Sequence, residues 1–172
     1  MTLPFAIPVL ETDRLTLREP REGDLSAITA FAASDRTRFI GGPGDALDSW
    51  RGFLRSIGHW AFRGYGWWVI EDRATGQVAG RCGVGFHPHY PEPELGWHIY
   101  DGFEGRGLAH EAALAARRHA QTVQGLGPLI SMIDPDNTRS LRLAERLGAR
   151  FERMGEIEGD PCQIWRHPAG AA

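Results

Sequence analysis

The sequence predicts an α/β fold around a mixed, mostly antiparallel sheet, and two patterns in the chain predict it. In the first, strand-like segments follow one another through short turns, as on either side of RATG at residues 73–76. In the second, a strand, an alanine-rich helix and a short apolar strand come in that order over residues 94–134. This order is typical of a parallel crossover.

Composition places the chain among ordinary globular proteins. It has 172 residues, of which 42% are hydrophobic and 24% charged, with a net charge of −3. There is no repeat or linker, so we expect one domain over residues 1–172. The start lacks a positive segment and contains Pro4 and Pro8, and no apolar run reaches the roughly 20 residues that span a bilayer. Since no basic tract suits nucleic acid either, we expect a cytoplasmic protein with no membrane or nucleic-acid partner.

Cysteine and histidine usage favours neither a disulfide framework nor a metal site. Cys82 and Cys162 are too few, and too far apart in the chain, for either. His87 and His89 form an H-x-H pair, which by itself is a weak metal signal. We therefore expect two free thiols and no bound metal.

The first half of the chain supplies a strand and two helices. RLTLRE, residues 14–19, alternates with the period of a strand, and residues 23–34 continue at helical spacing after Asp24, a residue type common at the N-cap. A glycine and proline loop then leads to a second helix over residues 47–62. Its apolar side should include Trp50, Leu54 and Trp60.

The later elements alternate between strands and helices. We expect strands within residues 65–72 and 76–88, in which the adjacent Trp67 and Trp68 must point to opposite faces. A strand over 94–100 contains Gly96, which is compatible with a bulge. Helices over 107–122 and 137–147, the second ended by Gly148, flank a strand within 127–134, and two strands close the chain.

One stretch has the local sequence of an anion site. In YDGFEGRGLAHEAALAARRHA, residues 100–120, Gly102, Gly105 and Gly107 come directly before the alanine-rich helix. A glycine turn that feeds a helix offers a phosphate its backbone N–H groups and the positive end of the helix dipole. The stretch is neither a P-loop nor a dinucleotide fingerprint, because His110 stands where the latter needs glycine. By itself it is equally typical of an ordinary turn.

Two linked motifs narrow this choice. ELGWHIYDGFEGRGLAHEAALAA at residues 94–116, followed by DPDNTRS at 134–140, resembles the GNAT superfamily of acetyl-coenzyme-A-dependent N-acetyltransferases. The closest likeness is to its ribosomal-protein N-terminal (Rim-type) subgroup. The family's Q/R-x-x-G-x-G/A segment corresponds to residues 104–109, with Glu104 in place of Gln or Arg, and His110 stands where the subgroup often has Thr. The resemblance implies a GNAT fold, with splayed fourth and fifth strands and helices on both faces of the sheet.

The resemblance also implies acetyl-CoA as co-substrate, with its diphosphate on the glycine turn and its pantetheine arm between the splayed strands. The residues implied to contact it are Trp97, His98, Ile99, Gly105, Arg106, Gly107, Leu108, Ala109 and Asn137. From the residues alone, Asn137 is also a good helix N-cap.

The implied reaction is direct attack of a primary amine on the thioester, through a tetrahedral intermediate. Glu94 is the candidate general base, and an exposed or salt-bridged strand-end carboxylate is the alternative; His98 is a weaker candidate. Ser140 stands where the subgroup places a hydroxyl near the sulfur, or else it is simply a first-turn helix residue. A backbone N–H near His98 or Ile99 is the natural oxyanion donor.

The acceptor is the least determined part. A protein N-terminal amine leads, and a small amine such as a polyamine or an antibiotic comes second. Glu156, Glu158 and Asp160 form an acidic loop that would suit a cationic acceptor or be merely solvated. The alternative from another class is a non-catalytic acyl-CoA-binding module. Dimers are common in the subgroup, so a homodimer is compatible with the sequence.

Overall fold

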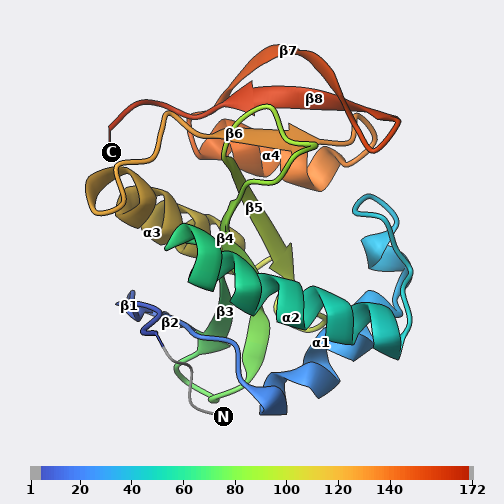
Figure 1. Ribbon diagram of the computed structural model, residues 1–172, viewed down its shortest axis with the longest axis vertical. Coiled ribbons are helices and arrows are strands. Elements are labelled where there is room, and N and C mark those ends of the chain that lie inside the picture. The colour runs from blue at the N-terminus through green and yellow to red at the C-terminus, as the bar shows by residue number, and fades with distance from the viewer. Residues whose placement is uncertain (1–4, 171–172) are drawn as a thin grey trace.

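A computed structural model describes residues 5–170, and within them eight strands form one sheet (Figure 1). The strand order is β1-β2-β3-β4-β5-β6-β8-β7. Every neighbouring pair is antiparallel except β5 with β6, which are parallel. The predicted α/β fold with a mixed, mostly antiparallel sheet is therefore confirmed.

The elements follow the predicted order. The strands are β1 (Leu10–Glu11), β2 (Leu15–Arg18), β3 (Trp67–Asp72), β4 (Val78–Gly85), β5 (Glu94–Ile99), β6 (Ile130–Ile133), β7 (Arg150–Ile157) and β8 (Asp160–Arg166). The helices are α1 (Leu25–Ala32), α2 (Ala46–Arg63), α3 (Leu108–Thr122) and α4 (Thr138–Arg146), with short 3-10 turns at Glu22–Asp24 and Asp35–Thr37. Strand β1 was not predicted, because two residues are too few to show an alternation.

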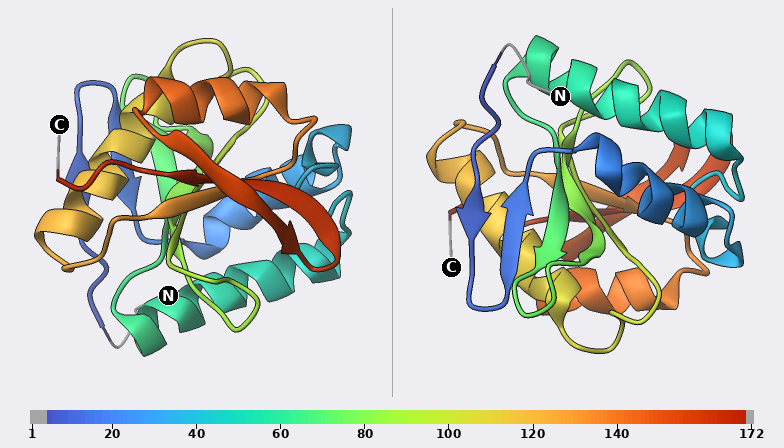
Figure 2. Two further views of the ribbon diagram at one scale, coloured as in Figure 1. Left: turned by 90° about the horizontal axis from the view of Figure 1, so that it is seen from above. Right: turned by 90° about the horizontal axis from the view of Figure 1, so that it is seen from below.

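The helices lie on both faces of the sheet, as Figure 2 shows: α1 and α2 cover one face, and α3 and α4 cover the other. Helix α3 packs closely because the side it turns to the sheet is lined by Ala112, Ala116 and Ala120, which are fully buried. Gly148 follows α4 with φ +76°, the left-handed conformation expected of a helix-ending glycine.

Two details of the helices differ from the sequence prediction. Asp24 stands at the N-cap of α1, but its side chain makes no cap. Its carboxylate instead accepts hydrogen bonds from the Arg18 guanidinium at 2.8 and 2.9 Å and from the Arg21 N–H at 2.7 Å. On α2, Trp60 is buried as expected, whereas Trp50 and Leu54 are 44% and 45% exposed, since they lie at the margin of the apolar side.

Gly96 marks the close approach of a side chain and not a bulge between β4 and β5. Strands β4 and β5 stay in register from Gly80 and Ile99 to Gly85 and Glu94. A Cβ on Gly96 would lie 2.5 Å from the Trp67 ring, so glycine is needed to admit this indole. Trp68 points to the opposite face and is fully buried, which confirms the expected split of the two tryptophans.

Strands β5 and β6, which are the fourth and fifth of the strands predicted from the sequence, splay apart, as the resemblance implied. Their ladder has a single pair, Glu94 with Ile130. Just beyond it, the Ser131 hydroxyl donates to the Leu95 carbonyl at 2.6 Å, and the His167 Nε2 atom lies 2.9 Å from the same hydroxyl oxygen. We call the divergence of β5 beyond Glu94 from β6 beyond Ile130 the fork.

Candidate active site

Glu94 lies at the apex of the fork, where it begins β5. Its side chain is buried, and within residues 5–170 it forms no salt bridge, so the exposed or salt-bridged alternative is wrong. Its Oε1 atom accepts one long hydrogen bond from the Met132 N–H, at 3.4 Å. Burial raises the pKa of Glu94 to about 7, and this hydrogen bond only partly opposes the rise. A carboxyl group with such a pKa exchanges protons readily at neutral pH.

His98 has the opposite electrostatic environment. Its ring stacks on Phe31 with centroids 5.6 Å apart and contacts Trp67 at 4.9 Å. Burial and the nearby Arg81 guanidinium lower the pKa of His98 to about 3. The imidazole is therefore neutral at pH 7 and a weak base, which favours Glu94 over His98 for proton removal.

The glycine turn before α3 has an open, donor-rich backbone. Gly102, Gly105 and Gly107 have φ of +84°, +71° and +77°. A Cβ on Gly105 would meet nothing within 4 Å, and one on Gly107 would meet only the Arg14 guanidinium. No side chain caps α3, and the N–H of Glu111 bonds to the Gly107 carbonyl, so the N–H groups before it have no acceptor inside the helix. This is the arrangement that binds a phosphate.

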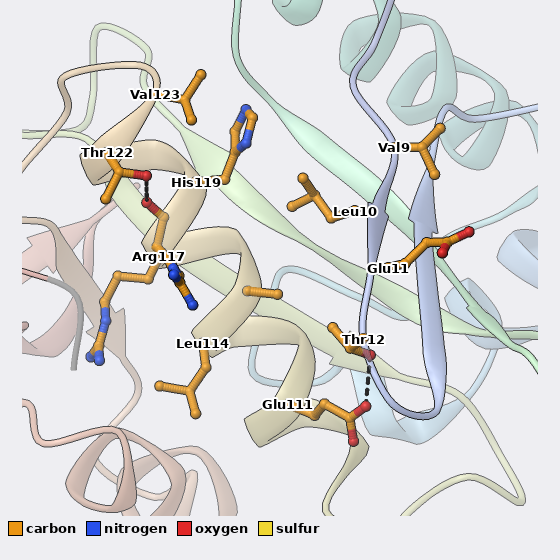
Figure 3. A pocket seen from close by; sticks show the side chains of 12 residues that line it. Val9, Leu10, Glu11, Thr12, Glu111, Leu114, Arg117, His119, Thr122 and Val123 are labelled. Carbon is orange, nitrogen blue, oxygen red and sulfur yellow. Dashed lines mark hydrogen bonds between the residues drawn. The ribbon is translucent and has the colours of Figure 1, made fainter.

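A cluster that sequence reasoning missed holds this turn in place. Arg14 donates to the Arg106 carbonyl at 2.7 Å and to the Glu111 carboxylate at 2.7 Å. Thr12 donates to the same carboxylate at 2.6 Å (Figure 3). Because these partners are more than 90 positions apart in the chain, no local motif could reveal them.

The two departures from the family motif have their own contacts. Glu104 pairs with Arg36 at 2.8 Å, which directs its carboxylate to that guanidinium. The His110 Nε2 atom lies 3.3 Å from the Arg146 carbonyl at the end of α4. Both side chains thus have partners elsewhere in the fold.

A hollow of about 610 Å³ lies between β1 and α3, lined by residues from 9–12 and from 111–123 (Figure 3). Of the residues that the sequence assigned to the site, none lines this hollow. It is therefore separate from the fork.

Asn137 and Ser140 meet at the start of α4. Asn137 caps the helix, because its Oδ1 atom accepts from the Ser140 N–H at 3.2 Å; the capping alternative is confirmed. The Trp97 indole N–H donates to the Ser140 Oγ at 3.3 Å, across the fork from β5. An indole nitrogen is only a donor, so Ser140 accepts this bond and keeps its own proton for another acceptor.

The remaining site predictions concern cysteines, metals and membranes. Cys82 and Cys162 are both buried and free. Over residues 5–170, no group of three or more His, Cys, Asp or Glu side chains is placed to hold a metal ion. Among the helices described in this range, none is both long and apolar enough to cross a membrane.

Comparison with known proteins agrees with this geometry. The family described as "Acetyltransferase (GNAT) domain" matches residues 14–150. The chain therefore belongs to the GNAT acetyltransferase family and is an acyltransferase.

Individual relatives support the same assignment. The chain is 30% identical to the Bacillus subtilis protein YkkB over 167 residues, 91% of this chain and 93% of that one. An acetyltransferase from Agrobacterium tumefaciens superposes with a TM-score of 0.89 at 38% identity, covering 98% of both chains. The ribosomal L7/L12 α-N-protein acetyltransferase RimL, solved with coenzyme A, superposes with a TM-score of 0.78 at 16% identity, over 96% of this chain and all (100%) of that one. The RimL likeness shows the fold.

Proposed function

We propose that the protein transfers the acetyl group of acetyl-CoA to a primary amine, with a protein N-terminal amine as the leading acceptor. The observation that carries the proposal is Glu94, a buried carboxyl group at the apex of the fork whose pKa is raised to about 7. Few structural roles need a buried carboxyl group with such a pKa, whereas a general base that removes a proton from an amine does need one.

The proposed cofactor contacts lie along the free edge of β5, on the glycine turn that follows this strand and at the start of α4. Backbone N–H groups between Gly105 and Ala109, including those of Arg106, Gly107 and Leu108, bind the diphosphate. Backbone groups of Trp97, His98 and Ile99 contact the pantetheine arm along the free edge of β5, and Asn137 contacts it from the start of α4. The unpaired edge beyond Glu94 supports this placement, because an extended chain of amides can bond to such an edge.

Each catalytic residue then has one task. Glu94 takes the proton that the amine loses as its nitrogen bonds to the acetyl carbon. A backbone N–H near His98 or Ile99 donates to the oxygen that becomes negative. As the carbon–sulfur bond breaks, the Ser140 hydroxyl orients or donates to the departing thiolate, and Trp97 fixes the Oγ position for this. The products are an amide and free coenzyme A.

Rim-type structural neighbours support the choice of a protein N-terminus, since the one solved with coenzyme A is named for an α-N-protein acetyltransferase. We also infer one N-acetyltransferase domain over residues 1–172, a cytoplasmic location and, from the subgroup, a homodimer. Light scattering of the purified chain tests the last of these.

The test of the function is thiol release from acetyl-CoA in the presence of a panel of peptides and small amines. Release that depends on an amine supports the proposal. Tight acetyl-CoA binding without release across the panel would instead support a non-catalytic acyl-CoA-binding module.

A further inference from the structure

Arg81 is a charged residue for which the proposed reaction has no use so far. It lies on β4 directly opposite His98 of β5. Side chains alternate along a strand, so Arg81 shares one face of the sheet with His98, Gly96 and Glu94. His98 stacks on Phe31 of α1, so this is the face that α1 and α2 cover (Figure 2). Leu95, on the opposite face, packs with the alanines of α3.

The guanidinium of Arg81 has no counter-ion. Its Nε atom is buried without a hydrogen-bond partner, and none of the salt bridges within residues 5–170 includes Arg81. The carboxylates of Asp24 and Glu71 in the same region both bind Arg18, at 2.8 and 2.6 Å. A buried guanidinium nitrogen without a hydrogen-bond partner is costly, so Arg81 is suited to a ligand that supplies an acceptor and the missing negative charge.

The strand register puts Arg81 and Glu94 on the two sides of one indole. Trp67 pairs with Gly83, and Gly83 pairs with Gly96. Arg81 lies two positions before Gly83 on β4, whereas Glu94 pairs with the residue two positions after it. The Arg81 guanidinium is 5.9 Å from the centre of the Trp67 ring. On the other side, the position that a Cβ would take on Gly96 is 2.5 Å from the same ring and 3.3 Å from the Glu94 Oε2 atom. Trp67, Arg81 and His98 all stay partly exposed, so solvent reaches this part of the sheet.

A second cation acts on the same place. Burial is the main cause that lowers the pKa of Arg81, and like-charge repulsion from Arg55, an exposed residue of α2, lowers it further, while Tyr100 and the Asp24 carboxylate partly oppose the shift. No side chain offsets this repulsion with a salt bridge to Arg81 in the described part of the chain. Together the two guanidinium groups make this area attractive to an anion.

We propose that Arg81 determines acceptor specificity by binding a carboxylate of the amine acceptor, which is separated from the reacting amine by about the width of the Trp67 indole. The inference rests on the proposed function, because it places the amine at Glu94. A carboxylate fits the planar guanidinium through two parallel hydrogen bonds. The carboxylate is either an acidic side chain next to a peptide N-terminus or the acid group of a small amino acid.

Paired acceptors that differ only in this charge test the proposal. One arm uses peptides with Asp or Asn, and Glu or Gln, at the second position; the other uses short ω-amino acids and their amides. For the wild-type enzyme loaded with acetyl-CoA, we expect the acid of at least one pair to show kcat/KM about ten- to a hundredfold above its amide, the range of one charge-assisted hydrogen bond. The arm that shows the preference identifies the source of the carboxylate.

The variants Arg81→Met and Arg81→Lys supply the mechanism control. Arg81→Met should abolish the preference while acetyl-CoA affinity stays as in the wild type, and Arg81→Lys should restore part of it. If Arg81→Met fails to fold, Arg81→Lys alone still has to reduce the ratio, because an ammonium cannot bind a carboxylate in the same bidentate way. Equal rates for acids and amides in the wild type, or a preference that survives Arg81→Met, would overturn the proposal.

The two proposals fail differently. Turnover without charge preference would remove only the role of Arg81. Absence of turnover with every amine would remove the proposed function, and the role of Arg81 would then be decided by peptide binding to the acetyl-CoA complex, with the same pairs and the same expected ratio.

Discussion

Replacement of Glu94 by Gln should change the pH dependence of stability in a way that does not involve catalysis. Glutamine keeps the oxygen that accepts from the Met132 N–H but cannot ionise. The pKa of Glu94 rises from its ordinary 4.5 to about 7 on folding, because the ionised form is deprived of water. At about 1.4 kcal/mol for each pKa unit, ionisation of the folded protein is disfavoured by about 3 kcal/mol.

The sign follows from linkage. A raised pKa means that the folded state holds this proton more tightly than the unfolded chain. The free energy of unfolding of the wild type is therefore highest below pH 4.5, and this stability is lost as the pH rises through about 7. The free energy of unfolding of Glu94→Gln, minus that of the wild type, should therefore increase by about 3 kcal/mol across this range. Denaturant unfolding of both proteins at a series of pH values measures this difference, and other titrating groups cancel.

A difference that stays constant with pH would refute the argument that Glu94 is desolvated. The same variant should lower kcat by about 10²- to 10⁴-fold if Glu94 is the general base. The pH dependence of the rate alone is less diagnostic. An α-amino acceptor loses its own proton near pH 8, and this also makes the rate rise with pH. Agreement of the two experiments would link the buried carboxyl group to the chemistry.

Three further predictions concern the phosphate turn, the leaving group and the C-terminal core. Gly107→Asn should weaken acetyl-CoA binding at least tenfold, since asparagine tolerates φ of +77° but places a side chain in the phosphate path. The matched control Gly64→Asn, at φ +74° after α2, should leave affinity unchanged, and equal losses in both would contradict the cradle. Ser140→Ala should lower kcat about fivefold to tenfold, as expected for one hydrogen bond, with KM for acetyl-CoA nearly constant; unchanged turnover in steady-state assays would remove Ser140 from the reaction. Burial, with a contribution from Arg117, lowers the pKa of His167 from 6.5 to about 4. The free energy of unfolding of the wild type should therefore fall by about 3 kcal/mol as the pH falls from 6.5 to 4, and that of His167→Gln should not. Parallel acid-unfolding curves for the two proteins would refute this.

Local patterns were sufficient for most of the fold. The alternation in RLTLRE, the glycine that ends α4 and the apolar spacing of α3 are properties of neighbouring residues, so the elements they predict appear with ends shifted by a few positions. The N-cap of α1 was only half right: Asp24 is in the expected place, but the Arg18 guanidinium competes for its carboxylate. Such competition depends on a partner brought in by the tertiary fold.

The candidate site divides along the same line. The glycine turn and Glu94 were found because they belong to contiguous motifs, and their roles remain predictions for experiment. No such motif marks Arg14 or Arg81. The partners of Arg14 are more than 90 positions away in the chain. Arg81 stands out only because its buried Nε atom has no hydrogen-bond partner, which a sequence does not show. Gly96 shows the limit most clearly, since its reason is the ring of Trp67 on a different strand.

The single ladder pair between β5 and β6 has a consequence for the cooperativity of the molecule. Strands β6, β8 and β7 come from one continuous segment, residues 130–166. Within residues 5–170, strand pairing joins them to the rest of the sheet only through Glu94 and Ile130. Amide hydrogen exchange should therefore resolve two opening units of different stability, one on each side of this seam. A ligand whose amides bond to the free edge of β5 would act as the missing length of strand. Once it is bound, the two units should exchange their protons as one.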